Sequence, residues 1–115
     1  MQKILNPIIA EDLNGTDATF SKSRGDDPVK LSVKLAFQRH IELVTGVEDK
    51  FKTFSLGLKL AKLDDYAKDI LLEDAELEHL SKLLKNIRNP AFTDIVYGQL
   101  EQVLDEAIHI ETKEK

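Results

Sequence analysis

Residues 29–44 read VKLSVKLAFQRHIELV, and they decide whether the first long element of the chain is a helix or a strand. From Val29 to Phe37 apolar and polar residues alternate, as they do in a half-buried strand. The same stretch carries an apolar stripe at helical spacing that begins at Val33, and no turn signal interrupts it before Gly46. Residues 29–37 are therefore open to both interpretations, and we favour the helix.

The favoured helix ends at Thr45–Gly46. Asp27 is a suitable N-cap for it, and Pro28 suits the first helical position, where no amide hydrogen is needed. Leu31 and Leu35 fall outside the main apolar stripe, so this helix would be apolar on two sides. We therefore expect it in the centre of the fold or at a subunit interface.

The first 27 residues predict a small β-hairpin or an extended arm. Short apolar pieces flank Asn14-Gly15, and this pair favours a tight turn because both residues accept a positive φ. Pro7 would confine the first strand to a sheet edge. A two-stranded hairpin is not stable alone, so we expect the arm to lie on the helical body or on a partner.

A second helix is predicted within residues 47–63. Gly57 lies inside it at a cost of roughly 1 kcal/mol relative to alanine, which indicates close contact with a neighbouring helix. Apolar residues at helical spacing predict an inner face beneath a lysine-rich face. The inner face holds Phe51, Phe54, Leu58 and Ala61, and the lysines are Lys50, Lys52, Lys59 and Lys62.

Two more helices follow a connection at residues 64–69. The third comes after Ile70-Leu71-Leu72, has acidic residues in its first turn, and is stopped by Asn89-Pro90. The fourth begins near Thr93, which is a good N-cap. Their predicted inner faces are Leu77, Leu80, Leu84 and Ile87 in the third helix, and Val96, Leu100, Val103, Leu104 and Ala107 in the fourth.

These elements predict a mainly α fold, a compact bundle of about four helices with an N-terminal β-hairpin or extended arm. Residues 1–27 form the arm and linker, residues 28–110 the helical body, and residues 111–115 a solvated tail. The chain has 115 residues. We expect a single domain, because a chain of this length could not fill a second core.

Composition excludes several classes of function. Without cysteine there is no thiolate nucleophile and no cysteine-ligated zinc. The formal charge of −5 argues against a nucleic-acid partner, because nucleic-acid-binding proteins neutralise phosphates with Lys and Arg. No signal peptide is evident, and no stretch approaches the roughly 20 apolar residues of a membrane span, so we expect a cytoplasmic protein without a membrane partner.

Two Glu-x-x-His spacings are the sharpest metal-like feature: Glu76 with His79, and Glu106 with His109. Two such pairs on facing helices, with two further glutamates, make the di-iron site of some four-helix bundles. Both pairs lie beside the apolar stripes rather than on them, however, and acidic residues are frequent in this chain. We therefore expect no metal and no cofactor.

Catalytic motifs are absent from the sequence. It contains no Gly-x-Ser-x-Gly, no Walker loop and no Gly-x-Gly-x-x-Gly. His40 has no matching nucleophile motif and lies near a helix end, where a structural role is expected. We therefore predict that the protein is not an enzyme.

Surplus apolar residues indicate a binding surface instead. The last helix carries more of them than one stripe needs, and Leu31 and Leu35 add to the excess. Such a surplus on a small domain marks self-association or a partner groove, unless the β arm covers it. The candidate interaction surface comprises Leu31, Leu35, Phe92, Ile95, Tyr97 and Gln99.

The running order of several short segments resembles a group of short proteins encoded by tailed bacteriophages. The segments are 27–31, 48–52, 56–61, 72–76, 95–100 and 103–106, and the likeness spans residues 4–106. The hydrophobic-Gly-Gln element at Val96 to Gln99 is the most distinctive of them. The resemblance implies a phage or prophage gene acting in the host bacterial cytoplasm or in the virion, and it implies no catalytic residues.

The leading hypothesis is a small phage-encoded protein-binding module. It would be non-enzymatic and oligomeric, and it would modulate a host or phage protein through an apolar, acid-rimmed surface. The first alternative is a virion or assembly component, such as a head-tail adaptor or assembly chaperone, whose arm adds a strand to a neighbour. The second alternative is a di-metal carboxylate bundle enzyme.

Overall fold

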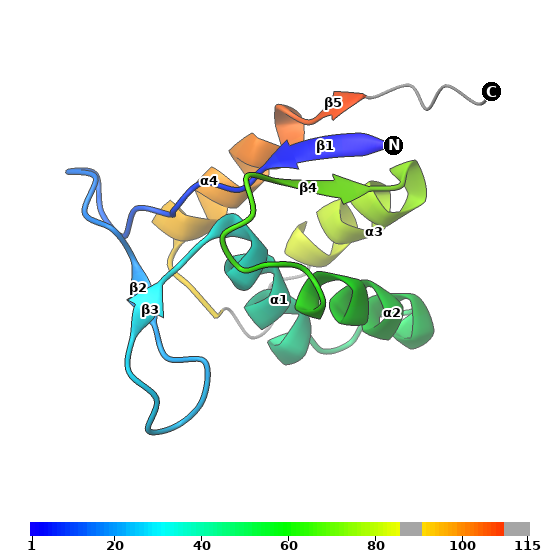
Figure 1. Cartoon of the computed structure of the whole chain (residues 1–115). Coiled ribbons are helices and arrows are strands. Elements are labelled where there is room, and N and C mark those ends of the chain that lie inside the picture. Colours follow the sequence, from blue (N-terminus) through cyan, green and yellow to red (C-terminus); the bar gives the residue numbers. More distant parts are fainter. Residues whose placement is uncertain (86–90, 110–115) are drawn as a thin grey trace.

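The computed structural model describes residues 1–85 and 91–109. In these ranges four helices pack together with short strands from the beginning, the middle and the end of the sequence (Figure 1). The helices are α1 (Val33–Leu43), α2 (Lys50–Ala61), α3 (Asp74–Lys85) and α4 (Asp94–Asp105). The strands are β1 (Gln2–Leu5), β2 (Thr19–Phe20), β3 (Val29–Lys30), β4 (Asp69–Leu72) and β5 (Ile108–His109). The four predicted helices are confirmed, whereas the sequence pattern does not predict β4 and β5.

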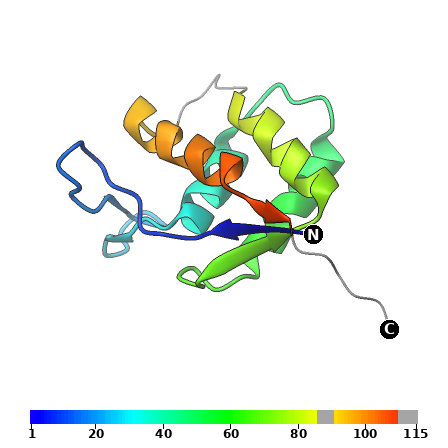
Figure 2. The same cartoon turned by 90° about the horizontal axis from the view of Figure 1, so that it is seen from above.

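A three-stranded antiparallel sheet has the order β4-β1-β5. Ile4 lies opposite Ile70, and Lys3 lies opposite both Leu71 and Ile108. Side chains alternate between the two faces of a strand, and Ile4 and Ile70 are buried. Their face of the sheet is covered by α3 and α4 (Figures 1 and 2).

The place of β1 corrects two expectations about the arm. β1 ends at Leu5, so Pro7 lies outside it and does not confine it to a sheet edge. β1 is instead the middle strand, with a partner on each side. β1 itself is therefore not free to add a strand to a neighbouring chain.

Residues 29–37 divide into a strand and a helix. Val29 and Lys30 form β3, and α1 begins at Val33 with Ser32 as its N-cap. The predicted helix start after Asp27 is wrong. The cause is tertiary: the backbone around Leu31 pairs with the arm before the helix begins.

α1 is the central helix, as predicted from its two apolar sides. Phe37 and Ala36 are fully buried, and His40 contacts both α3 and α4. The helix ends at Leu43, just before Gly46, whose φ of 73° is accessible to glycine at no steric cost. The predicted end of this helix is confirmed to within a few residues.

The hairpin predicted around Asn14-Gly15 is also present. The amide of Glu11 donates to the carbonyl of Thr16 at 2.8 Å, and the amide of Ala18 donates to the carbonyl of Ile9 at 2.8 Å. Gly15 has a φ of 83°, which explains the glycine at the turn. The hairpin lies on the helical body, which is the first of the two placements expected for the arm.

α2 presents the opposite face from the one predicted. Its buried residues are Thr53, Leu56 and Leu60, whereas Phe51 and Phe54 are exposed. The predicted inner face is therefore wrong, and Leu58 and Ala61 are exposed as well. The helix carries apolar residues on two sides, and only one of those sides can face a core in a monomer.

Gly57 explains how α2 approaches α1. A Cβ atom at this position would lie 3.1 Å from Cγ2 of Ile41, closer than ordinary van der Waals contact. The close contact predicted from Gly57 is confirmed.

The inner faces of α3 and α4 follow the prediction. Leu80 and Leu84 of α3 are buried, as are Val96, Leu100 and Val103 of α4. Thr93 is the N-cap of α4, although its side chain makes no capping hydrogen bond. Ile87, Asn89-Pro90 and the tail at 111–115 lie outside the described residues. None of the helices in the described ranges is long and apolar enough to span a membrane.

Candidate functional site

Half of the predicted interaction surface lies in the core. Leu31, Leu35 and Tyr97 are only 1%, 3% and 5% exposed, so the prediction that they form a binding face is wrong. The arm covers Leu31, whose amide donates to the carbonyl of Ala18 and whose carbonyl accepts from the amide of Ile9. The alternative, in which the β arm covers surplus apolar residues, therefore holds at Leu31.

The other three predicted residues do not form one surface. Ile95 is exposed, whereas Phe92 is partly buried with its ring centroid 6.0 Å from that of Tyr97. The side-chain amide of Gln99 is hydrogen-bonded to the backbone of Ala10 on the arm. Only Ile95 offers an exposed apolar side chain to a partner.

His40 is a buried link between three helices. Its Nε2 lies 2.7 Å from the carbonyl of Leu83, and its Nδ1 lies 2.8 Å from the hydroxyl of Tyr97. A carbonyl only accepts, so Nε2 carries the hydrogen and Nδ1 of the neutral ring accepts from the hydroxyl. The hydroxyl oxygen in turn accepts from the amide of Ala91 at 3.1 Å.

Burial lowers the pKa of His40, although the hydrogen bond to Leu83 opposes this effect. Burial likewise raises the pKa of Tyr97. Both groups therefore stay neutral near pH 7, and each is hydrogen-bonded within the core. This geometry supports the structural role predicted for His40.

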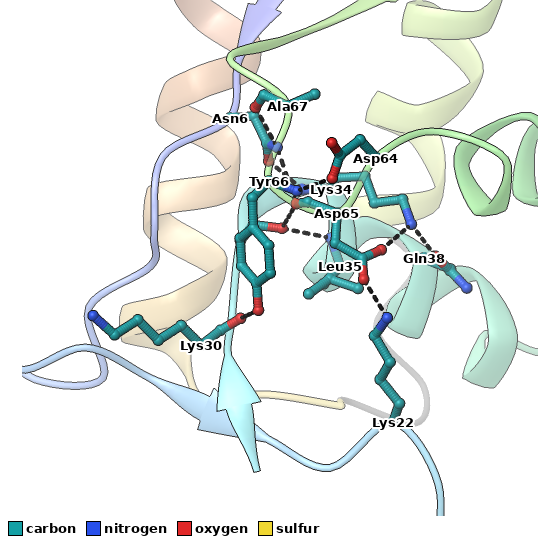
Figure 3. A network of polar contacts seen from close by, with 11 residues as sticks. Asn6, Lys22, Lys30, Lys34, Leu35, Gln38, Asp64, Asp65, Tyr66 and Ala67 are labelled. Carbon is teal, nitrogen blue, oxygen red and sulfur yellow. Dashed lines mark hydrogen bonds and ion pairs between the residues drawn. The ribbon is translucent and has the colours of Figure 1, made fainter. Parts of the chain in front are cut away.

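Lys34 and Asp65 form the most buried ion pair among the described residues (Figure 3). The side chain of Lys34 is 2% exposed, and its Nζ lies 2.6 Å from Oδ1 of Asp65 and 2.9 Å from Oε1 of Gln38. Lys22 from the arm reaches the other carboxylate oxygen of Asp65. Charge on Lys34 is tolerated in the interior because these partners replace water.

The backbone of Asp65 completes this network. Its carbonyl accepts from Ser32 Oγ at 2.6 Å and from Asn6 Nδ2 at 3.2 Å, while Asn6 Oδ1 accepts from the amide of Lys34 at 2.7 Å. Burial raises the pKa of Asp65, but hydrogen bonds from Lys22 and Lys34 and their charges outweigh it, so the net shift is downward. The network fastens the arm, α1 and the α2–β4 loop together.

The first Glu-x-x-His pair faces α2. The carboxylate of Glu76 lies 2.6 Å from Nζ of Lys59, and Nε2 of His79 lies 2.9 Å from Oγ1 of Thr53. Each member of the pair therefore has a polar partner on the neighbouring helix.

The second pair lies elsewhere, at the end of α4 and on β5. Nδ1 of His109 lies 3.1 Å from Nε2 of Gln2, and Glu106 accepts from Gln102 within its own helix. In the ranges 1–85 and 91–109 no three His, Asp or Glu side chains are placed to hold a metal ion. The geometry that a di-metal site would require is not formed by these four residues.

The outer side of α2 is an exposed apolar face that the sequence analysis assigned to the core. Phe51, Phe54 and Leu58 are 78%, 63% and 44% exposed. Their spacing of three and four residues places them on one side of the helix. The sequence held one signal that could have revealed this face. Leu56 and Leu60 form a second apolar stripe on the other side of the helix, so one of the two stripes had to remain exposed in a monomer.

A groove of about 710 Å³ runs beside this face, between α1 and α2. Gly57 forms part of its wall, and the exposure of Phe54 and Leu58 leaves it open along α2. Most of the lining is apolar. The apolar lining includes Ile41, Val44, Val47, Phe54, Leu58 and Ala61.

Lysines rather than acids flank the apolar face. α2 and its C-cap carry Lys50, Lys52, Lys59 and Lys62, and no acidic residue lies between residues 50 and 62. Glu42 of α1 is an acidic residue lining the groove from the opposite side. The expected acid-rimmed surface is thus replaced on α2 by a basic one.

Comparisons of the chain with protein family models, curated proteins and solved structures found no match.

Proposed function

We propose that this protein is a non-enzymatic binding module, and that the groove between α1 and α2 receives an apolar segment of a partner protein. The observation that carries the proposal is the exposure of Phe54 and Leu58 beside this groove. Fully burying one such side chain is worth about 1.5–3 kcal/mol, so a partner that covers both gains substantial free energy.

The shape of the groove favours a protein segment over a small molecule. Pockets for small ligands enclose most of the ligand surface. Here the wall formed by Phe54 and Leu58 is largely exposed, and the groove follows the length of α2. A helix or an extended strand of a partner fits such an open groove.

The buried polar groups support a non-enzymatic role. His40 is engaged by Leu83 and Tyr97, and Lys34 by Asp65 and Gln38. These groups hold elements of the fold together, and of them only Gln38 lines the groove. The resemblance to short tailed-phage proteins adds a setting, in which the partner is a host or phage protein in the bacterial cytoplasm.

Capture from bacterial lysate by the immobilised chain tests the proposal. We expect at least one protein, identified by mass spectrometry, to be retained by the wild type and lost by Phe54→Ser/Leu58→Ser. The matched control is Leu13→Ser/Ile108→Ser, which removes two exposed apolar side chains elsewhere (92% and 53% exposed). Retention that is equal for both double variants would contradict the proposal.

A further inference from the structure

We infer that the segment received by the groove is an amphipathic helix with an acidic residue near each end of its apolar face. This inference rests on the proposed function and names the chemistry of the partner. It is drawn from the order of charged and apolar side chains along α2.

One row of side chains follows the outer side of α2. Lys50, Phe54, Leu58 and Lys62 are spaced by four residues each, and residues four apart are neighbours on a helix surface. The row is about 18 Å long, at 1.5 Å per residue. Its centre is apolar and each of its ends carries a positive charge.

The two end lysines have no acidic partner among the described residues. Ion pairs in the ranges 1–85 and 91–109 engage Lys59 with Glu76, but none includes Lys50 or Lys62. Lys50 lies in the first turn of α2, which holds no acidic residue, while the N-cap Asp49 uses its carboxylate to accept from the amide of Lys52. The chain as a whole is acidic, with a formal charge of −5, so this basic row differs in sign from the rest of the molecule.

A partner helix complementary to this row has apolar residues in its middle and carboxylates about twelve residues apart. Apolar residues three and four positions apart would enter the groove between α1 and α2, which is a known mode of helix recognition. The carboxylates would then meet Lys50 and Lys62. Complementary charge of this kind selects the partner and fixes its register.

A second copy of the chain is a poorer occupant of the same face. If two α2 helices packed antiparallel, Lys50 of one would lie beside Lys62 of the other. If they packed parallel, each lysine would face its own counterpart. Both arrangements place like charges together, which disfavours the contact.

Selection from a displayed library of amphipathic helices tests the inference. The library keeps Leu, Ile or Phe on one face and offers Glu, Lys or Gln at the positions near each end. Binding is selected on the wild-type chain, and each clone is re-tested on Phe54→Ser/Leu58→Ser to identify those that use the groove.

We expect groove-dependent clones to be enriched in Glu at both ends. We also expect their affinity to fall roughly tenfold on Lys50→Glu/Lys62→Glu, since each exposed ion pair contributes up to about fivefold. The control Lys3→Glu/Lys85→Glu changes the net charge equally, away from α2, and should leave the affinity within about twofold.

Three results would overturn the inference. They are groove-dependent clones without a preference for Glu, a dimer in light scattering that Phe54→Ser/Leu58→Ser dissolves, and binding to phosphatidylglycerol vesicles that the same variant abolishes. The first result leaves the proposed function standing, because the groove still binds a helix. If no clone depends on the groove and no protein captured from lysate depends on it either, both the proposed function and this inference are wrong.

Discussion

The side-chain amide of Gln99 on α4 is hydrogen-bonded to both the backbone amide and the backbone carbonyl of Ala10. Oε1 of Gln99 accepts from the amide of Ala10 at 2.9 Å, and Nε2 donates to the carbonyl of Ala10 at 2.7 Å. The side-chain amide thus makes the pair of hydrogen bonds that a neighbouring strand would make. Nε2 also donates to the carbonyl of Ile95, which orients the side chain. This contact fastens the arm hairpin to the helical body.

Replacing Gln99 with alanine should therefore loosen the hairpin. We expect a loss of about 1–3 kcal/mol in the free energy of unfolding, because two partly buried backbone groups lose their partner. Amide hydrogen exchange at residues 10–17 should become faster. Gln102→Ala is the control on the exposed side of α4, and an equal effect of both substitutions would show that the contact with Ala10 contributes nothing.

The stability of the protein should depend on pH through His40. The folded state lowers the pKa of this residue, so the unfolded chain binds more protons at moderately acidic pH. Its contribution is fully present above the unfolded pKa of about 6.5 and is lost as the pH falls from there towards the folded pKa. The slope is at most about 1.4 kcal/mol per pH unit.

Urea unfolding of the wild type and His40→Gln between pH 8 and pH 5 measures this dependence. The wild type should lose more stability than the variant below pH 6.5, and other titrating groups cancel in the comparison. Parallel curves for the two proteins would rule out the predicted effect of His40.

Substitutions in the Lys34–Asp65 network should differ in severity. Asp65→Asn leaves the charge of Lys34 buried without a counter-charge, and breaking buried pairs in this way costs about 3–5 kcal/mol. The partial exposure of Asp65, whose side chain is 22% exposed, places the expected loss at the lower end of that range. Lys34→Met should cost less, because Lys22 still neutralises Asp65.

Lys22→Ala should cost about 0–1 kcal/mol, since the side chain of Lys22 is 48% exposed. Chemical denaturation of the three variants tests this order. If Lys22→Ala were the most destabilising of the three, the Lys34–Asp65 ion pair would not be the main contribution of this network to stability.

Gly57 and Gly98 offer a matched pair of helical glycines. A Cβ atom at Gly57 would lie 3.1 Å from Ile41, whereas a Cβ atom at Gly98 would meet nothing within 4 Å. Gly98→Ala should stabilise the protein by about 0.5–1 kcal/mol through helix propensity. Gly57→Ala should destabilise it by about 1 kcal/mol, because overpacking costs more than propensity returns. Thermal unfolding gives the sign of each change.

Truncating side chains on the two faces of α2 should change stability by very different amounts. Leu60→Ala removes a fully buried side chain and should cost about 2–5 kcal/mol. Phe54→Ser removes a side chain that is 63% exposed and should change stability by no more than about 0.5 kcal/mol. The urea unfolding midpoints of the two variants measure these losses. A large loss for Phe54→Ser would mean that this side chain belongs to the core.

Much of the helical part of the fold could be predicted from local patterns. The buried faces of α3 and α4 follow from apolar residues at helical spacing, because each helix has one dominant stripe. The binding face could not be predicted in the same way. α2 has two apolar stripes, and spacing alone does not show which of them faces the core, so the stripe with Phe51 and Phe54 was wrongly assigned to it.

The strands were less accessible to prediction. β4 spans only Asp69–Leu72, and its three apolar residues fit a strand or a helix start equally well. Its partner β1 lies more than sixty residues earlier in the sequence, so no local signal connects the two. Residues 29–32 likewise adopt extended structure only because their backbone pairs with segments of the arm.

The sequence by itself determined the four helices and the hairpin turn at Asn14-Gly15, because each depends on residues near in the chain. A glycine inside a helix also indicated the close approach at Gly57, but only tertiary packing supplies its neighbour, Ile41. Only the tertiary structure decided that Gln99 is hydrogen-bonded to the arm and that the arm covers Leu31. Tertiary packing also decided which side of α2 remains exposed. The physical reason is that periodicity shows which residues share a face, whereas the contacts made by the whole chain determine what that face meets.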